Sequence, residues 1–372
     1  MVVTTPGVHA FRLVAVTAAL TVLFALINPM PASAHIVGTG GSATNIQTRL
    51  TAIRPAVPTV AVTLGLGGQW VRVTNQGAAE VVILGYRGDP FLRLFRNQVQ
   101  VNQLSATATE TGLTPGSPAP GNPAAGRSAA GGLTAGGPTA GGPTAGGPTA
   151  GGKTAEPRWV RSSDGDSATW ADARIGPQPA SQQASGPWQL PLLVDGQQVT
   201  AVGTWDLIPP PSPWPWVAVL VLLTAAVAAI GWMRDWNRPM AAVVTVGILA
   251  FVAHVLGTGF APQQSGPLIG WVGVGLVVAF ALLVGVVSTV STLRRSESAP
   301  DRAVTVGAII LLLAATDLSV LWNSQLPFPG PGALDRGLTV IFYAAALGLI
   351  VAGIRLVRVV KSSRIQPGRT TG

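Results

Sequence analysis

Cysteine is absent from this chain of 372 residues, histidine occurs three times, methionine four times, and only 10% of the residues are charged. Without cysteine, no disulfide can stabilise an exported domain, so such a domain depends on a buried apolar core. Catalytic signatures are also lacking, because there is no nucleophile-elbow motif, no zinc motif and no pair of acids at a recognisable spacing. We therefore predict that the chain is not an enzyme.

The low charge accompanies five long apolar segments in the second half of the chain. Each is close to the ~20 residues needed to cross the hydrocarbon core of a bilayer. Each should be a helix, because lipid offers backbone amides no other hydrogen-bond partner. The sequence thus predicts a five-helix transmembrane bundle over 216–357, made of Trp216–Met233, Met240–Phe260, Leu268–Val290, Ala303–Trp322 and Leu338–Val357.

Basic residues are concentrated in every second connection of this region. Two arginines follow the first segment, three lie between the third and the fourth, and the basic tail 358–372 follows the fifth. The positive-inside rule assigns these regions to the cytoplasm. The connection Ala261–Pro267 has no charge, and the one after the fourth segment has only Asp335 and Arg336, so both should face outward.

The N-terminus resembles an export signal. The apolar run Leu13–Ile27 is followed by the small-residue pattern Ala32-Ser33-Ala34, which predicts a secretory signal peptide over 1–34. Cleavage after Ala34 would leave residues 35–213 outside the cytoplasm, in agreement with a cytoplasmic C-terminus. The predicted location is the plasma membrane, with several crossings.

The net charge of +9 and the pI of about 11.4 arise largely from the basic residues of the predicted cytoplasmic regions. Ten basic residues lie in the predicted cytoplasmic regions, whereas 35–213 holds 11 basic and 9 acidic residues. The basicity therefore reflects topology and at most attraction to anionic lipid. The lipid bilayer is a predicted partner, and nucleic acid is not.

Short strand-like segments rich in β-branched and aromatic residues fill 35–105 and 158–208, and Asp195-Gly196 is a strong two-residue hairpin signal. We predict an extracytoplasmic antiparallel β-sandwich of immunoglobulin-like type, in two sequence parts. The expected strands are Gln47–Ile53, Thr59–Leu64, Trp70–Thr74, Glu80–Tyr86, Phe91–Phe95, Val99–Leu104, Trp159–Arg161, Ala168–Ile175, Trp188–Val194 and Val199–Leu207. Residues 209–215, rich in proline and tryptophan, form a stiff juxtamembrane spacer.

Between the two β parts lies a low-complexity insertion, 106–157, in which Thr-Ala-Gly-Gly-Pro repeats from positions 134, 139 and 144. Such a composition cannot bury a core, so we expect a disordered surface loop, either O-glycosylated or a neutral repeat expansion. The stretch Gly147–Thr154 fits the phosphate-binding pattern G-x-x-x-x-G-K-[ST]. That loop works only between a strand and a helix N-terminus, so no nucleotide is expected.

Three polar residues stand out within the apolar segments: His254, Asp317 and Tyr343. Counted along helices at ~1.5 Å per residue, all three fall at one level in the outer third of the bilayer. An intramembrane acid usually has a partner, and His254 is the natural one for Asp317. The three residues form either an outward-opening pocket for a proton, a cation or a small ligand, or an interhelical hydrogen-bonded contact.

Several segments together resemble a family of actinobacterial exported membrane proteins that is itself largely uncharacterised. They are Ala34-His35, 51–58, 82–86 with 89–93, the stretch Trp170-Ala171-Asp172-Ala173-Arg174, and 210–216. The resemblance implies an exported multi-pass protein with a β ectodomain. In those relatives the Trp170–Arg174 stretch reads like W-H-D-H-R, whereas this chain has Ala171 and Ala173, so a metal role for that stretch is not carried over.

After cleavage His35 would become the N-terminal residue, as in the copper-resistance periplasmic proteins whose mature chains also begin with histidine. Its amine and imidazole could chelate Cu(II), with carboxylates such as Asp89 or Asp172 completing the site. The alternative is that His35 is an ordinary N-terminal residue. Two functions therefore stay open: a membrane-anchored module that binds an envelope or membrane-protein partner, and a component of copper or other metal handling.

Overall fold

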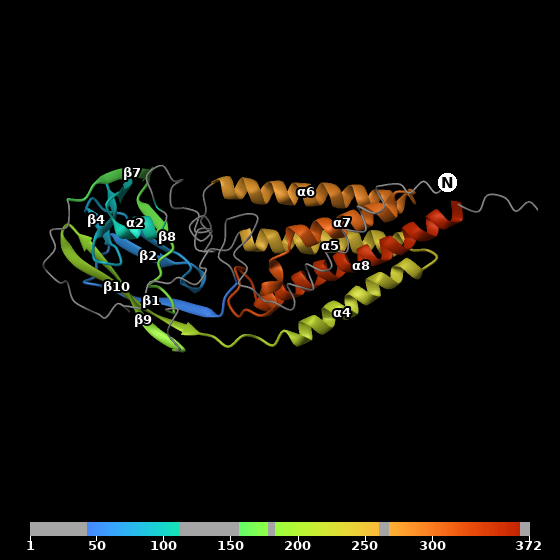
Figure 1. Cartoon of the computed structure of the whole chain (residues 1–372), viewed down its shortest axis with the longest axis horizontal. Helices are drawn as coiled ribbons and strands as arrows, with labels where there is room; N and C mark the ends of the chain where they lie inside the picture. Colours follow the sequence, from blue (N-terminus) through green and yellow to red (C-terminus); the bar gives the residue numbers. More distant parts are fainter. Residues whose placement is uncertain (1–42, 112, 114–155, 178–182, 260–267, 365–372) are drawn as a thin grey trace, which may run out of the picture. The chain divides into compact units, whose positions relative to one another are not determined.

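The computed structural model describes residues 43–111, 113, 156–177, 183–259 and 268–364. The predicted signal peptide, His35, the Thr-Ala-Gly-Gly-Pro repeats, the connection after the second apolar segment and the end of the basic tail lie outside these residues. The described residues form two compact units. We call 43–209 the β unit and the residues from 210 onward the helical unit (Figure 1).

All strand pairs in the β unit are antiparallel. One sheet has the order β1-β10-β9-β4-β5-β6-β7 and the other the order β2-β3-β8. An antiparallel β domain is confirmed, but the division into seven and three strands is not clearly immunoglobulin-like. The strands are β1 Ile46–Arg54, β2 Val60–Leu64, β3 Val71–Asn75, β4 Val81–Leu84, β5 Pro90–Phe95, β6 Gln98–Asn102, β7 Trp159–Asp164, β8 Ser167–Trp170, β9 Ser185–Val194 and β10 Gln197–Leu207.

Alternation of side chains builds the core of the β unit. In β3, Val71 and Val73 are fully buried, while Arg72 between them points away, as the period of two requires. Residues of both sheets belong to one apolar cluster, and the rings of Phe91 and Trp170 meet edge to face at 5.9 Å across them. This core holds the unit together without a disulfide.

Two local features frame the inserted stretch and the last hairpin. Asp195 and Gly196 both have positive φ, 48° and 77°, so the predicted two-residue turn between β9 and β10 is confirmed. The first residues of 106–157 form a short helix, α2 Ala106–Glu110, whose N-cap Ser105 accepts a hydrogen bond from the Ala108 amide. These residues belong to the folded β unit rather than to a disordered loop.

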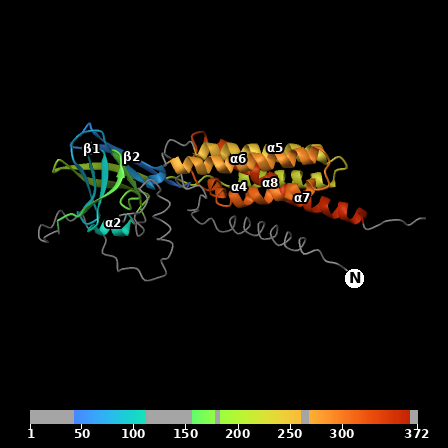
Figure 2. The ribbon, with the colours of Figure 1, turned by 90° about the horizontal axis from the view of Figure 1, so that it is seen from above.

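The helical unit contains α4 Trp214–Ala229, η3 Ile230–Trp232, α5 Asn237–Gly259, α6 Leu268–Leu293, α7 Ala299–Leu313, η4 Asp317–Leu321 and α8 Gly332–Arg364. In the described residues four helices are long and apolar enough to cross a membrane: Trp214–Trp232, Asn237–Gly259, Val272–Leu293 and Gly332–Val359. Figure 2 shows these helices running alongside one another. A multi-pass membrane protein is therefore supported.

The prediction of one continuous fourth helix over Ala303–Trp322 is wrong. The α-helix ends at Leu313 and a 3-10 helix, η4, begins at Asp317. At the break, the carbonyl oxygen of Ala314 accepts hydrogen bonds from the Tyr343 hydroxyl and from the Asp317 amide. The Tyr343 side chain of α8 and the Asp317 amide thus satisfy the Ala314 carbonyl oxygen in place of the hydrogen bond that a continuous α-helix would make.

Helix α8 packs against α4, α5 and α7. Glycines allow the close approach: a methyl group at Gly353 would lie 2.8 Å from the carbonyl oxygen of Pro300, and one at Gly231 would lie 2.9 Å from Ala352. Small residues at helix contacts are typical of membrane proteins. Helices α4 and α6 instead expose large apolar side chains, such as Leu222 at 69% and Leu283 at 63%, which suits contact with lipid.

Candidate functional site

Three ionisable side chains from three elements meet inside the helical unit. His254 comes from α5, Asp317 from the start of η4 and Asp335 from the first turn of α8. The imidazole Nδ1 lies 2.7 Å from Asp335 Oδ1, and Nε2 lies 3.5 Å from Asp317 Oδ2. All three side chains are buried, with exposures of 3%, 9% and 0%. We call them the acid–histidine cluster.

The hydrogen bonding favours a particular form of the imidazole. A neutral imidazole has a single N–H donor, so one of its two nitrogens would turn a lone pair toward a carboxylate oxygen. An imidazolium donates from both nitrogens and fits both carboxylates. If both carboxyl groups are ionised, their positions fit the doubly protonated ring of His254.

One aromatic ring of α8 lies against the imidazole, and a second, from α5, packs on that ring. The Phe342 ring lies 5.5 Å from the His254 ring, and Phe251 meets Phe342 edge to face at 5.6 Å. Tyr343, predicted at the same level, is also buried. Its hydroxyl donates to the Ala314 carbonyl group instead of joining the cluster, so it fixes the break next to Asp317.

Arg336 anchors the far end of the broken segment. Its Nε donates to the carbonyl oxygen of Val320 at 3.1 Å, and one terminal nitrogen donates to that of Asn323 at 2.7 Å. The predicted outward connection therefore does not contain Asp335 and Arg336, because both lie in the first turn of α8. Arg336 directly follows Asp335 in the sequence.

Sequence reasoning missed Asp335. The signal was present, since Asp335, Thr339 and Phe342 lie at spacings of four and seven on one face of α8, and all three are fully buried. Starting the fifth segment at Leu338 excluded that first turn. Asp335 was consequently assigned to a solvent-exposed connection.

Two oxygen atoms beside the cluster have no hydrogen-bond partner among the described residues: Oδ2 of Asp335 and Oγ1 of Thr339. Both residues have an exposure of 0%, and they are one helical turn apart. No group of three or more His, Cys, Asp or Glu in the described part of the chain is arranged to hold a metal ion. In the cluster, both imidazole nitrogens already face carboxylates.

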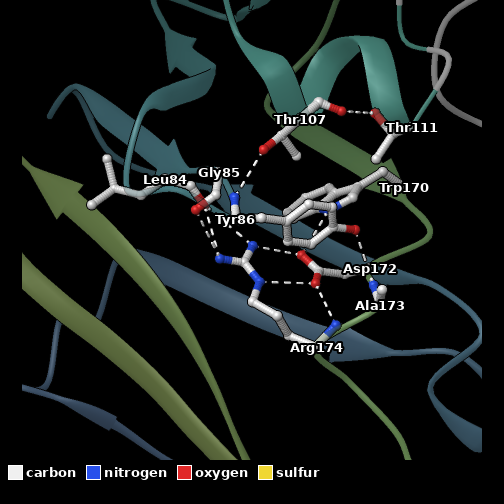
Figure 3. A network of polar contacts seen from close by, with 9 residues as sticks. All are labelled: Leu84, Gly85, Tyr86, Thr107, Thr111, Trp170, Asp172, Ala173 and Arg174. Atoms are coloured by element: carbon white, nitrogen blue, oxygen red, sulfur yellow. Dashed lines mark hydrogen bonds and ion pairs between the residues drawn. The ribbon is translucent and has the colours of Figure 1, made fainter. Parts of the chain in front are cut away.

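A second polar network lies in the β unit, around the Trp170–Arg174 stretch (Figure 3). The buried Asp172 carboxylate accepts from Trp170 Nε1 at 3.0 Å and from Arg174 Nε and a terminal nitrogen at 2.9 and 2.7 Å. Arg174 also donates to the carbonyl oxygens of Leu84 and Gly85 at 3.1 and 3.3 Å. The network ties the end of β8 to the end of β4.

Tyr86 completes this network. Its hydroxyl accepts a hydrogen bond from the Ala173 amide at 3.1 Å, and its own amide donates to Thr107 Oγ1 of α2 at 2.8 Å. Burial raises the pKa of Tyr86, and the charge of Asp172 raises it further. Asp172 is held by Trp170 and Arg174, and the copper site predicted at His35 lies outside the described residues.

No family model, no curated protein and no solved structure matches this chain. The resemblance to exported actinobacterial membrane proteins therefore stays a prediction. Any functional conclusion has to come from the chemistry of the described residues.

Proposed function

We propose that this chain is a multi-pass membrane protein of the cell envelope whose helical unit binds and releases a proton at the acid–histidine cluster. The observation that carries the proposal is the burial of His254 between Asp317 and Asp335. Ionisable groups inside a membrane are costly and are typical of proton and ion pathways. A break in a helix at the same position is a further feature of such sites.

Charge counting supports a proton as the ligand. Two carboxylates face one imidazole, the charge of Arg336 acts on Asp335, and the second proton of His254 supplies the remaining positive charge. Loss of that proton leaves one carboxylate uncompensated in a buried site, which costs several kcal/mol. The cluster thus couples proton binding to the packing of α5, η4 and α8.

In the predicted orientation, the acid–histidine cluster lies toward the outside of the cell. We count the broken fourth segment, α7 with η4, as a membrane crossing in addition to the four long helices. The arginine-rich connections are then cytoplasmic. The end of α5 and the start of α8 then lie in the outer half of the bilayer. In this arrangement the β unit is extracytoplasmic and serves as an immunoglobulin-like binding module for an envelope or membrane-protein partner.

The metal-handling alternative stays a prediction. His35 lies outside the described residues, and no described observation favours copper over a proton. We therefore put the proton-binding function first.

Nuclear magnetic resonance of the ring nitrogens tests the function directly. The chain has only three histidines, so ¹⁵N-histidine labelling of the full-length protein in lipid nanodiscs gives few signals, and His254→Gln assigns the one of interest. We expect both ring nitrogens of His254 to be protonated at neutral pH and this form to be lost in Asp335→Asn. A neutral ring in the wild-type protein at neutral pH would refute the proposal.

The absence of cysteine makes the orientation easy to test. Single cysteines replace exposed Gln76 in the β unit and exposed Glu297 between α6 and α7. We expect a membrane-impermeant thiol reagent to label Gln76→Cys in intact cells and Glu297→Cys only after lysis. The reverse pattern would overturn the orientation without affecting the cluster.

A further inference from the structure

One arginine near the end of α8 is held in place with most of its guanidinium group unused. Arg355 donates from Nε to the carbonyl oxygen of Gly231 at 3.2 Å, and its guanidinium carbon lies 4.3 Å from the centre of the Trp232 ring. These two contacts fix the side chain against η3. Its two terminal nitrogens make no hydrogen bond or ion pair with a described residue, so they are available to a ligand.

The chemistry of this arrangement indicates an anionic ligand with several oxygens. A guanidinium group is a planar fork of N–H donors that matches the oxygens of a phosphate group. Stacking on the indole ring of Trp232 orients this fork. Trp232 is 60% exposed, so the stacked pair faces the surroundings of the helical unit.

Both residues lie near the ends of candidate membrane spans. Trp232 is the last residue of the span Trp214–Trp232, and Arg355 lies four residues before the end of the span Gly332–Val359. At 1.5 Å per residue, the 28 residues of the latter span measure ~42 Å, more than the ~30 Å of a hydrocarbon core. Such a helix extends into the headgroup region, where tryptophan is enriched.

The same end of the helical unit carries a surplus of positive charge. Arg355 joins α8 to η3, and an ion pair of 3.7 Å between Arg295 and Asp235 joins the connection after α6 to the one after η3. Among the described residues at this end, seven arginines accompany three acids: Arg234, Arg238, Arg294, Arg295, Arg302, Arg355 and Arg358 with Asp235, Glu297 and Asp301. This charge complements anionic headgroups.

We propose that Arg355 and Trp232 form a binding site for the phosphate headgroup of an anionic phospholipid. The terminal nitrogens of Arg355 bind the phosphate oxygens, and the exposed ring of Trp232 lies against the glycerol and the first part of an acyl chain. Arg355 follows Asp335 by twenty residues, or ~30 Å along α8. The lipid site is therefore remote from the acid–histidine cluster and does not depend on proton binding.

Native mass spectrometry of the full-length protein measures the lipids that bind. The protein in detergent is titrated with phosphatidylglycerol, which has an anionic headgroup, or with phosphatidylcholine, which is zwitterionic and has the same acyl chains. We expect the first phosphatidylglycerol to bind more tightly than the first phosphatidylcholine. Equal affinities for the two lipids would overturn the proposal.

Two variants locate the site, and a third controls for charge. Arg355→Gln removes the charge-assisted hydrogen bonds to phosphate, so the affinity for the first phosphatidylglycerol should fall at least ~10-fold. Trp232→Leu removes the ring on which the guanidinium group is stacked, keeps the charge, and should also weaken binding. Arg294→Gln removes the same charge from an exposed position directly after α6 and should leave the affinity unchanged.

The outcomes separate a defined site from general attraction and from a structural role. If Arg355→Gln and Arg294→Gln weaken binding equally, the arginines attract anionic lipid only collectively, and the site is overturned. If Arg355→Gln lowers the melting temperature while Trp232→Leu binds phosphatidylglycerol like wild type, Arg355 only holds Gly231 and the proposal is wrong. An excess of inorganic phosphate should not displace the lipid, and displacement would assign the site to free phosphate instead.

Discussion

The Nδ1 atom of His254 lies 2.7 Å from Oδ1 of Asp335, although 81 residues separate them in the sequence. This bond joins α5 to the first turn of α8. On its other side the ring faces Asp317, at the place where the fourth apolar segment stops being α-helical. The contact therefore connects three elements at one buried point.

Replacing Asp335 with asparagine should strongly destabilise the helical unit. The exchange leaves His254 with one buried carboxylate partner in place of two, and breaking a buried ion pair costs about 3–5 kcal/mol. We expect a clear loss of thermal stability in detergent, measured by the fraction that stays monodisperse after heating. Asp301→Asn, an exposed acid in the first turn of α7, is the matched control and should behave like wild type. Equal stability of both variants would contradict the role given to Asp335.

On α8, replacing Gly353 with alanine should lower the stability of the helical unit, whereas replacing Gly337 with alanine should raise it slightly. A methyl group at Gly353 would lie 2.8 Å from the carbonyl oxygen of Pro300, whereas one at Gly337 has no atom within 4 Å. Overpacking costs about 1–3 kcal/mol, while alanine in an open helical position gains up to ~1 kcal/mol. Melting curves of the two variants in detergent measure the difference. A tolerated Gly353→Ala would mean that α7 and α8 are not so closely packed.

Arg174→Met should loosen the β unit locally. The variant removes the donors that hold Asp172 and the carbonyl groups of Leu84 and Gly85. Asp172 has an exposure of 0% and keeps its bonds from Trp170 Nε1 and the backbone amide of residue 174, but the loss of its only ion-pair partner among the described residues should cost about 3–5 kcal/mol. Hydrogen exchange of the full-length protein should speed up at the end of β8 and after β4.

Arg161→Met provides the control for this change. Arg161 also pairs with an aspartate, Asp164, but both side chains are more than half exposed, at 55% and 70%. Pairs of this kind contribute at most ~1 kcal/mol. We expect no change in exchange at β8 or β4, and a matching effect of both variants would argue against the network in Figure 3.

Alkaline pH should destabilise the β unit through Tyr86. Its pKa in the folded chain is raised above the usual 10.0 by burial and then by Asp172, so the unfolded chain loses this proton at lower pH than the folded chain does. The stabilising contribution is fully present below pH ~10 and is lost as the pH rises through the raised pKa. Tyrosinate absorbance of the wild type minus that of Tyr86→Phe follows this residue. Ionisation at or below pH 10 in the folded protein would contradict the prediction.

Much of the β unit could be predicted from local patterns. Each of the ten expected strand segments corresponds to a strand, and Asp195-Gly196 forms the expected turn. Which strands pair with one another was harder to predict from the sequence, because β4 lies beside β9, more than one hundred residues away. Strand alternation reports which face is buried but not which strand lies next in the sheet.

The sequence by itself determined the membrane character of the helical unit and the antiparallel β character of the first part, because apolar length and alternation are local properties of the chain. Only the tertiary structure decided that the fourth segment breaks after Leu313, that Asp335 joins His254 inside the unit, and that Asp172 is held by Trp170 and Arg174. Each of these outcomes depends on how a buried carboxylate or carbonyl group finds its partner. For the break and for Asp335, that partner comes from a distant part of the chain, so spacing along the sequence does not specify it.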